Sequence, residues 1–287
     1  MVIGGGAAGM SAAAGAAERG HQVTIFERSD RLGGQLHLAG APPGREEFLG
    51  LAHDLARQLS NHGVSVALNQ EVNAALLDEV KPDIVVLATG GASIIPPIPG
   101  VELRHVVQAW DVLSGNVLTG RRVVVIGGGA VGIETALFLA EKGTLSGEAL
   151  KFLLVHEAES PDKLYGLAVR GTKEVTVIEV IDELGKNFGK TTRWGMLQDV
   201  ERLGIRTKTT ARALEITSSH VRIESTAGVE EIPADTVVLA VGTKAFNPLQ
   251  EIVAKKGIPF HVAGDAATPG TVFDAIHQGF AVGAGIN

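Results

Sequence analysis

The stretch VIGGGAAGMSAAAGAAERG, residues 2–20, is repeated almost position for position by RVVVIGGGAVGIETALFLAEKG, residues 122–143. Each copy runs from a short apolar segment through Gly-x-Gly-x-x-Gly into a segment of helical length that is rich in small and apolar residues. A strand, a glycine turn and a helix in this order form a phosphate-binding turn. Its first glycine allows the tight turn, its second lets backbone N–H groups approach a pyrophosphate, and its third lets the helix pack closely on the strand. The duplication therefore predicts an α/β protein with two Rossmann-like dinucleotide-binding domains.

An acidic residue follows each turn at the end of the next predicted strand. Glu27 ends QVTIFE, and Glu179 ends VTVIE. A carboxylate at this place can bind the hydroxyls of an adenosine ribose. The residues after Glu179 are two apolar and two acidic ones: Val180, Ile181, Asp182 and Glu183. Since no basic residue stands there to receive a 2′-phosphate, and carboxylates would repel one, the second turn is predicted to prefer NADH to NADPH.

Two further segments extend the pattern. VVLAVG, residues 237–242, matches IVVLATG, residues 84–90, so each copy has a third strand that ends in glycine. Near the end of the chain, HVAGDA, residues 261–266, reads as a strand ending in Gly-Asp, and a helix is expected over residues 273–284. Asp265 could bind a ribityl hydroxyl, and the positive end of the helix dipole could face a flavin carbonyl. Together with the first turn, this makes the second half of a predicted FAD site.

These repeats predict a nicotinamide domain inserted in a discontinuous FAD domain. The FAD domain is expected over residues 1–107 and 243–287, and the NAD(P)H-binding domain over residues 108–242, with IIPPIPG, residues 94–100, as a linker. The second copy also carries an insertion, residues 144–173, which begins with an amphipathic, helical pattern. It is either a surface elaboration or an element that docks a partner.

Composition excludes several other kinds of chemistry. The 287-residue chain has no cysteine, so it has no disulfide, redox CxxC, thiolate nucleophile or cysteine-ligated cluster of its own. Its formal net charge of −7 disfavours a nucleic-acid surface. No apolar run has the roughly 18 residues of a membrane span, and no secretory leader is recognisable, so the expected compartment is the cytoplasm. No metal site is expected, because no histidine has ligand spacing with a second one. No catalytic side chain is predicted, since the chemistry of such a protein belongs to its cofactors.

The order of these motifs resembles the two-dinucleotide-binding flavoproteins that include the pyridine nucleotide-disulfide oxidoreductases. Three segments are closer still to the C-terminal part of 2,4-dienoyl-CoA and 2-enoate reductases: GREEFLGLAHDLARQLSNHGVSV, residues 44–66, AWDVLSG, residues 109–115, and GDAATPGTVFDAIHQGF, residues 264–280. In those enzymes, an N-terminal barrel similar to old yellow enzyme holds FMN and a 4Fe-4S cluster. The resemblance therefore implies a partner barrel upstream or on another chain.

The resemblance also assigns cofactor-binding residues. The FAD set is Gly4, Gly6, Ala7, Ala8, Gly9, Glu27, Arg28, Gly34, Gln35, Ala88, Thr89, Gly90, Gly264, Asp265, Ala266, Ala275 and Ile276. The nicotinamide set is Gly127, Gly129, Ala130, Val131, Gly132, Glu179 and Gly242.

The implied function is an FAD-dependent oxidoreductase module that accepts a hydride from NADH and passes electrons onward. Because the first predicted strand is short and starts abruptly, we expect further sequence upstream. Two alternatives remain open. One is a structural module that holds ADP or FAD without catalysis, and the other is a stand-alone reductase of the ferredoxin or rubredoxin type. The absence of a CxxC excludes thioredoxin reductase activity.

Overall fold

The computed structural model describes residues 1–186 and 188–287, and the chain divides into two compact units. The first unit comprises Met1–Ala92 and Thr243–Asn287, and the second comprises Ser93–Gly242. The sequence placed the first division at residue 107, after the proline-rich segment. In the structure that segment belongs to the second unit, because Ile98 and Val101 pack against its core.

The first unit is built on a parallel sheet with the strand order β15-β4-β1-β2-β3. Its strands are β1 (Val2–Ile3), β2 (Thr24–Phe26), β3 (Ser65–Ala67), β4 (Val85–Leu87) and β15 (Phe260–Val262). Its helices are α1 (Ala7–Glu18), α2 (Leu36–Ala39), α3 (Glu47–Asn61), α4 (Ala74–Val80), α10 (Gln250–Lys255) and α11 (Val272–Ala284), with a short 3₁₀ turn, η1 (Gly264–Ala266). The central strands are short apolar runs that are buried on both faces, as parallel sheets require.

The second unit repeats this plan, with the strand order β6-β13-β7-β8-β9. The strands are β6 (Val106–Gln108), β7 (Arg122–Ile126), β8 (Glu174–Ile178), β9 (Arg206–Lys208) and β13 (Thr236–Leu239). The helices are α5 (Ala109–Leu113), α6 (Ala130–Ala140), α7 (Gly147–Val155), α8 (Pro161–Val169) and α9 (Lys190–Arg202). An antiparallel sheet, β10 (Ala211–Ile216), β11 (His220–Ser225) and β12 (Gly228–Pro233), packs on it through an apolar cluster. The strands β5 (Gly91–Ser93) and β14 (Thr243–Ala245), where the chain leaves and re-enters the first unit, form a separate two-stranded sheet.

In both units the strand that enters the glycine turn lies at the centre of the sheet. On one side of β1 or β7 lies the strand that ends in the acidic residue, and on the other lies the strand that ends in glycine. The α/β class with two Rossmann-like folds, which the duplication predicted, is thereby confirmed.

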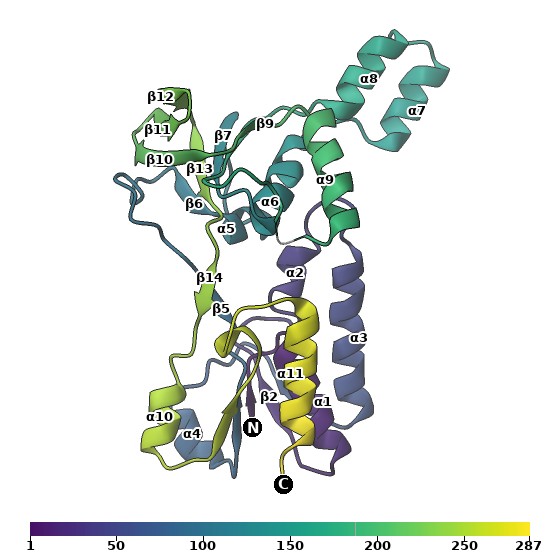
Figure 1. Ribbon diagram of the computed structural model, residues 1–287. Coiled ribbons are helices and arrows are strands. Elements are labelled where there is room, and N and C mark those ends of the chain that lie inside the picture. Colours follow the sequence, from purple (N-terminus) through teal and green to yellow (C-terminus); the bar gives the residue numbers. More distant parts are fainter. Residues whose placement is uncertain (187) are drawn as a thin grey trace. The chain divides into compact units, whose positions relative to one another are not determined.

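Helices α1 and α11, which come from opposite ends of the chain, lie side by side in the first unit (Figure 1). Glycine makes this close packing possible. A Cβ atom on Gly279 would lie 2.1 Å from the carbonyl oxygen of Ala8, and one on Gly283 would lie 2.1 Å from that of Ala12. The pairing therefore fixes the C-terminal helix directly against the residues that follow the first glycine turn.

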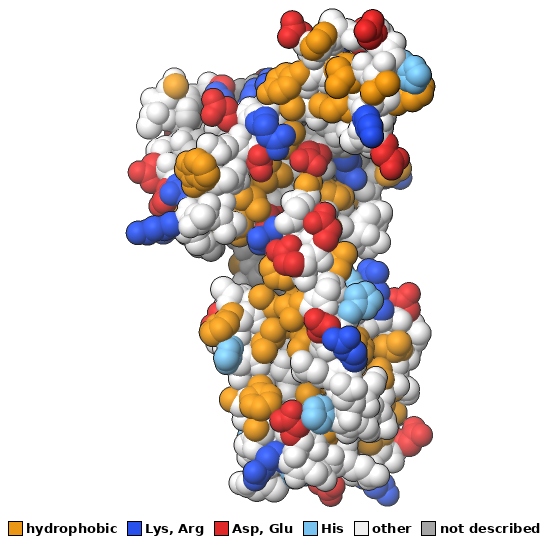
Figure 2. Space-filling view, turned by 90° about the vertical axis from the view of Figure 1, so that its right-hand side faces the viewer, with side chains coloured by type: hydrophobic (Ala, Val, Ile, Leu, Met, Phe, Trp, Pro, Cys, Tyr) orange, Lys and Arg blue, Asp and Glu red, His pale blue; other side chains and the backbone are white. Residues whose placement is uncertain are grey.

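The insertion is helical, as its pattern predicted, but it forms two helices. Each begins with a serine cap: Ser146 accepts a hydrogen bond from Ala149 N, and Ser160 accepts one from Lys163 N. The hairpin of α7 and α8 extends away from the rest of the second unit (Figure 1). No residue of α7 is buried, and the exposed apolar side chains of this hairpin include Phe152 and Tyr165. Figure 2 shows hydrophobic side chains at the surface of the second unit. Among the described residues, no helix is long and apolar enough to cross a membrane.

Candidate dinucleotide-binding sites

The three glycines of the first turn have different surroundings. A Cβ atom on Gly4, whose φ is +107°, would lie 2.2 Å from Ala88 O, and one on Gly9 would lie 1.9 Å from Gly4 O. A Cβ atom on Gly6 would have no other atom within 4 Å. The outer glycines are therefore required by the packing of strand, turn and helix. The space at Gly6 is open beside the N-terminus of α1, where an anion is favoured.

The second turn repeats this construction. A Cβ atom on Gly127, whose φ is +108°, would lie 2.4 Å from Ala240 O, and one on Gly132 would lie 1.8 Å from Gly127 O. A Cβ atom on Gly129 would again have no atom within 4 Å. Two segments about 120 residues apart thus leave open space at the same glycine, the one that lets a backbone approach a pyrophosphate.

The two acidic residues hold the turns in place. Glu27 accepts a hydrogen bond from Gly5 N on Oε2, at 2.7 Å, and one from Ser29 N on Oε1, at 2.8 Å. Glu179 accepts one from Gly128 N on Oε2, at 2.6 Å, and one from Ile181 N on Oε1, at 3.1 Å. Glu27 Oε1 also accepts from the Ser29 hydroxyl, at 2.8 Å. Because an ionised carboxylate offers about four acceptor positions, Glu27 retains capacity for one further donor and Glu179 for two, such as the hydroxyls of a ribose.

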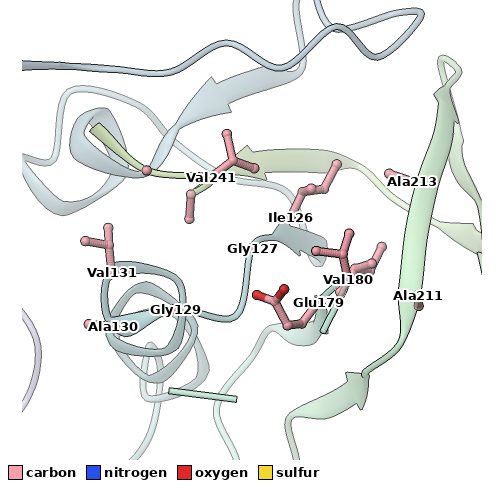
Figure 3. Close-up of a pocket in the computed structure, with 13 residues that line it drawn as sticks. Ile126, Gly127, Gly129, Ala130, Val131, Glu179, Val180, Ala211, Ala213 and Val241 are labelled. Atoms are coloured by element: carbon pink, nitrogen blue, oxygen red, sulfur yellow. The ribbon is translucent and has the colours of Figure 1, made fainter. Parts of the chain in front are cut away.

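A cavity of about 310 Å³ lies at the second turn (Figure 3). Its walls are the glycine turn, Glu179 and Val180 after β8, and Ala211 and Ala213 of β10. Six of the seven residues predicted for the nicotinamide cofactor line it: Gly127, Gly129, Ala130, Val131, Glu179 and Gly242. The seventh, Gly132, lies beneath the turn, in contact with Gly127. The apolar part of the cavity, next to the anchored carboxylate, is suited to an adenosine.

Three loops converge at the predicted FAD site. The first is the Gly-Gly-Gln loop, where a Cβ atom on Gly34 would lie 3.1 Å from Gly6 Cα. Gln35 Nε2 donates to Asp265 Oδ2 at 2.9 Å, and Gly270 N donates to Asp265 Oδ1 at 3.1 Å. The glycine turn, the Gly-Gly-Gln loop and the Gly-Asp turn therefore meet, although Gln35 and Asp265 are 230 positions apart.

The remaining residues of the predicted FAD set surround this point with one exception. Ala88, Thr89 and Gly90 follow β4, and a Cβ atom on Gly264 would lie 2.6 Å from that of Ala8. The packed members are Ala7, Ala8, Ala88, Ala266, Ala275 and Ile276, which are buried or half-buried. Arg28 is exposed, and its place in the site rests on its position next to Glu27.

The N-terminus of α11 is fixed by a reciprocal cap. The hydroxyl of Thr271 accepts from Asp274 N at 3.2 Å, and a carboxylate oxygen of Asp274 accepts from Thr271 N at 2.9 Å. The hydrogen bonds from Thr271 lower the pKa of Asp274. The first turn of this helix is therefore well ordered and carries a carboxylate that is ionised at neutral pH.

Sequence reasoning missed some residues at these sites. Ala211 and Ala213 line the cavity from a strand that carries no recognisable motif. Glu134 is not among the residues that line the cavity. It is a buried carboxylate, 8% exposed, and the one acidic residue in the apolar helix AVGIETALFLA.

The family model for pyridine nucleotide-disulphide oxidoreductases matches residues 1–268. Over 98% of its length, the chain is 44% identical to a protein named metal reductase from Desulforamulus reducens and 37% identical to one named NADH oxidase from Thermoanaerobacter brockii. It covers 42% and 40% of those proteins. A solved structure of a 2-naphthoyl-CoA reductase superposes with a TM-score of 0.85 at 30% identity, covering 99% of this chain and 39% of that one.

These similarities confirm the resemblance that the motifs carried. The chain spans about two fifths of the length of the relatives it matches. The oxidoreductase character predicted from the sequence is also confirmed, since the matching family is one of pyridine nucleotide-dependent oxidoreductases and the similar proteins are named as reductases and an NADH oxidase. The individual residues assigned to each cofactor remain predictions.

Proposed function

Because the chain belongs to the pyridine nucleotide-disulphide oxidoreductase family, we propose that its first unit binds FAD, and that its second binds NADH as the hydride donor. When bound, a flavin supplies the ability to accept a hydride from a reduced nicotinamide and to release the electrons onward. The observation that carries the proposal is the matched construction of the two turns. In each, the outer glycines are closed by backbone oxygens, the middle one faces open space, and a carboxylate anchors the turn.

The residues of the chain bind and orient. The N–H groups at the starts of α1 and α6 would bind the two pyrophosphates, and Glu27 and Glu179 would each accept from a ribose. Asp265, held by Gln35 and Gly270, would receive a ribityl hydroxyl. The capped N-terminus of α11 would lie towards the flavin ring and favour negative charge there.

We propose NADH rather than NADPH as the donor. Glu179 accepts hydrogen bonds from two backbone N–H groups, so its charge is held at the position that a 2′-phosphate would approach. Val180, which lines the cavity, is apolar and 62% exposed. A Michaelis constant for NADPH well below that for NADH would overturn this preference.

We further propose that the electrons leave for a barrel domain with FMN and a 4Fe-4S cluster, either on the same polypeptide or on another chain. The support is the similarity to a reductase of an aromatic acyl-CoA, of which this chain spans 39%. Without cysteine, the chain itself cannot supply thiolate ligands to such a cluster.

The test is an anaerobic titration of the FAD-loaded chain with NADH. We expect the visible flavin bands to bleach with about one equivalent of NADH, as the two-electron reduction of one flavin requires. A matched Glu179→Gln variant should retain its flavin spectrum but need more NADH for the same bleaching. An isolated protein with only adenine absorbance would instead favour a structural nucleotide-binding module. A flavin that neither NADH nor NADPH reduces would refute the hydride transfer.

A further inference from the structure

One lysine lies one strand away from the wall of the cavity. Lys208 is the last residue of β9, and its carbonyl oxygen accepts a hydrogen bond from Glu179 N at 2.8 Å. It is paired in register with Ile178, which lines the cavity. Neighbours in register on parallel strands point to the same face of a sheet, about 4.8 Å apart. The Lys208 side chain therefore lies on the same face as the cavity wall, one strand away from Ile178.

The charge of this lysine is matched by a single carboxylate. Lys208 Nζ lies 2.8 Å from Oε1 and 3.0 Å from Oε2 of Glu230 on β12. Glu230 alternates along β12 with Glu231, so it lies on the face of buried Ile232. Ile232 belongs to the apolar cluster that includes Ile178, Ala211 and Ala213, three residues of the cavity wall. The ion pair thus stands at the edge of the cluster that forms the cavity.

The other charges near this point do not replace it. Glu179 is acidic, and Asp182, three positions further along, would also repel a phosphate. Arg212 lies between Ala211 and Ala213 on β10. Because side chains alternate along a strand, Arg212 points to the face opposite the cavity. Of Lys208 and Arg212, Lys208 is therefore the one that lies on the face of the cavity wall.

We propose that Glu230 determines cofactor specificity: it neutralises Lys208, so that the 2′-phosphate of NADPH meets no net positive charge beside Glu179. This inference rests on the proposed binding of a nicotinamide dinucleotide at the second turn. It adds a second basis for the preference for NADH, one that lies on β9 and β12 rather than in the residues that follow Glu179.

The ion pair is suited to such a role because it is weak. Both side chains are 40% exposed, and pairs this accessible contribute at most about 1 kcal/mol. Removing Glu230 should leave the fold intact and free the Lys208 ammonium for another anion. A single half-exposed contact of this strength corresponds to an affinity change of about fivefold.

The test compares the binding of NADPH and NADH to the full chain by titration calorimetry. We expect Glu230→Gln to raise the affinity for NADPH about fivefold relative to that for NADH, with the gain shrinking as salt is added. Glu231→Gln is the matched control. It makes the same charge change on the next residue of the strand, where the carboxylate contacts His220 instead, and we expect no change in the ratio. In the double variant Lys208→Met with Glu230→Gln, the ratio should return to that of the unmodified chain.

Three results would overturn the proposal. They are an equal gain for both nucleotides, an equal gain in Glu231→Gln, and a gain that survives in the double variant. Circular dichroism melting of each variant verifies that it is folded. Because binding is measured without flavin reduction, a chain that binds both nucleotides but does not oxidise them contradicts only the proposed hydride transfer. A chain that binds neither contradicts both proposals.

Discussion

Two glycines of the second turn, three residues apart, should respond in opposite ways to the same substitution. Gly129→Ala and Gly132→Ala each add one methyl group to the start of α6. A Cβ atom at position 132 would lie 1.8 Å from Gly127 O, whereas one at position 129 would have no other atom within 4 Å. Gly132→Ala should therefore damage the fold, and Gly129→Ala should damage only nucleotide binding.

The magnitudes follow from these distances. Since non-bonded contacts are favourable near 3.5 Å, and this one would be 1.8 Å, Gly132→Ala requires α6 to move from the turn by about 1.7 Å. Overpacking of this kind costs about 1–3 kcal/mol, and a rigid backbone oxygen places it at the upper end. Gly129 has φ −70° and ψ −170°, which alanine adopts without strain, so Gly129→Ala should leave stability unchanged or raise it by about 0.4–1 kcal/mol.

Binding reverses the order of the effects. A methyl group at position 129 occupies the space through which backbone N–H groups would reach a phosphate. The loss of one charge-assisted hydrogen bond, about 1.5–3 kcal/mol, should weaken NADH binding about 10- to 100-fold. Urea denaturation followed by circular dichroism gives the stability, and fluorescence titration with NADH gives the affinity. If Gly129→Ala binds NADH like the unmodified chain, or unfolds as readily as Gly132→Ala, the reasoning about the open middle glycine is wrong.

Three further results are expected. Gly279→Ala should lower stability by about 1–3 kcal/mol, measured by thermal melting, since its Cβ would lie 2.1 Å from a backbone oxygen of α1. Hydrogen bonds from Arg122 lower the pKa of Asp235 to about 2. The pair therefore stabilises the fold above pH ~4 and loses this effect as pH falls towards 2, and Asp235→Asn should flatten that part of the curve of unfolding free energy against pH. Gln35→Leu should weaken FAD binding about tenfold in a flavin titration while leaving NADH affinity unchanged, because it removes one of two donors to Asp265.

Much of the fold could be predicted from the sequence because the glycine turns restrict the local backbone geometry. A strand, three glycines and a helix of small residues admit one local geometry, and its repetition gave the order of elements in both units. The boundary between the two units after residue 92 could not be predicted, since prolines show only that a segment is not helical. Whether such a segment joins a unit depends on the distant residues against which Ile98 packs.

Site residues that belong to a recognisable motif could be predicted from the sequence, whereas residues that only line the cavity from a strand could not. Glu27 and Glu179 were predicted from their place at the end of the strand that follows each turn. Ala211 and Ala213 were not, because a cavity needs small side chains there and an alanine in a strand carries no signal of its own. The contact of Lys208 with Glu230 was also hidden, since it joins strands that pair with different neighbours.

The structural match between the two copies extends further along the chain than the sequence match, and the two candidate sites differ where it ends. Gly33 N donates to Gly5 O at 2.8 Å, and Gly185 N donates to Gly128 O at 2.7 Å. A Leu-Gly pair thus crosses each turn at the same point, although the insertion obscures this match in the sequence. Beyond this pair the two copies diverge. The first continues with Gly34 and with Gln35, whose side chain contacts Asp265 of the Gly-Asp turn, and the second continues with Lys186. The shared part comprises the two glycine turns that we propose as the pyrophosphate sites. The divergent part includes Gln35, which contacts Asp265 in the second half of the FAD site that we propose, and the proposed nicotinamide site needs no such second half.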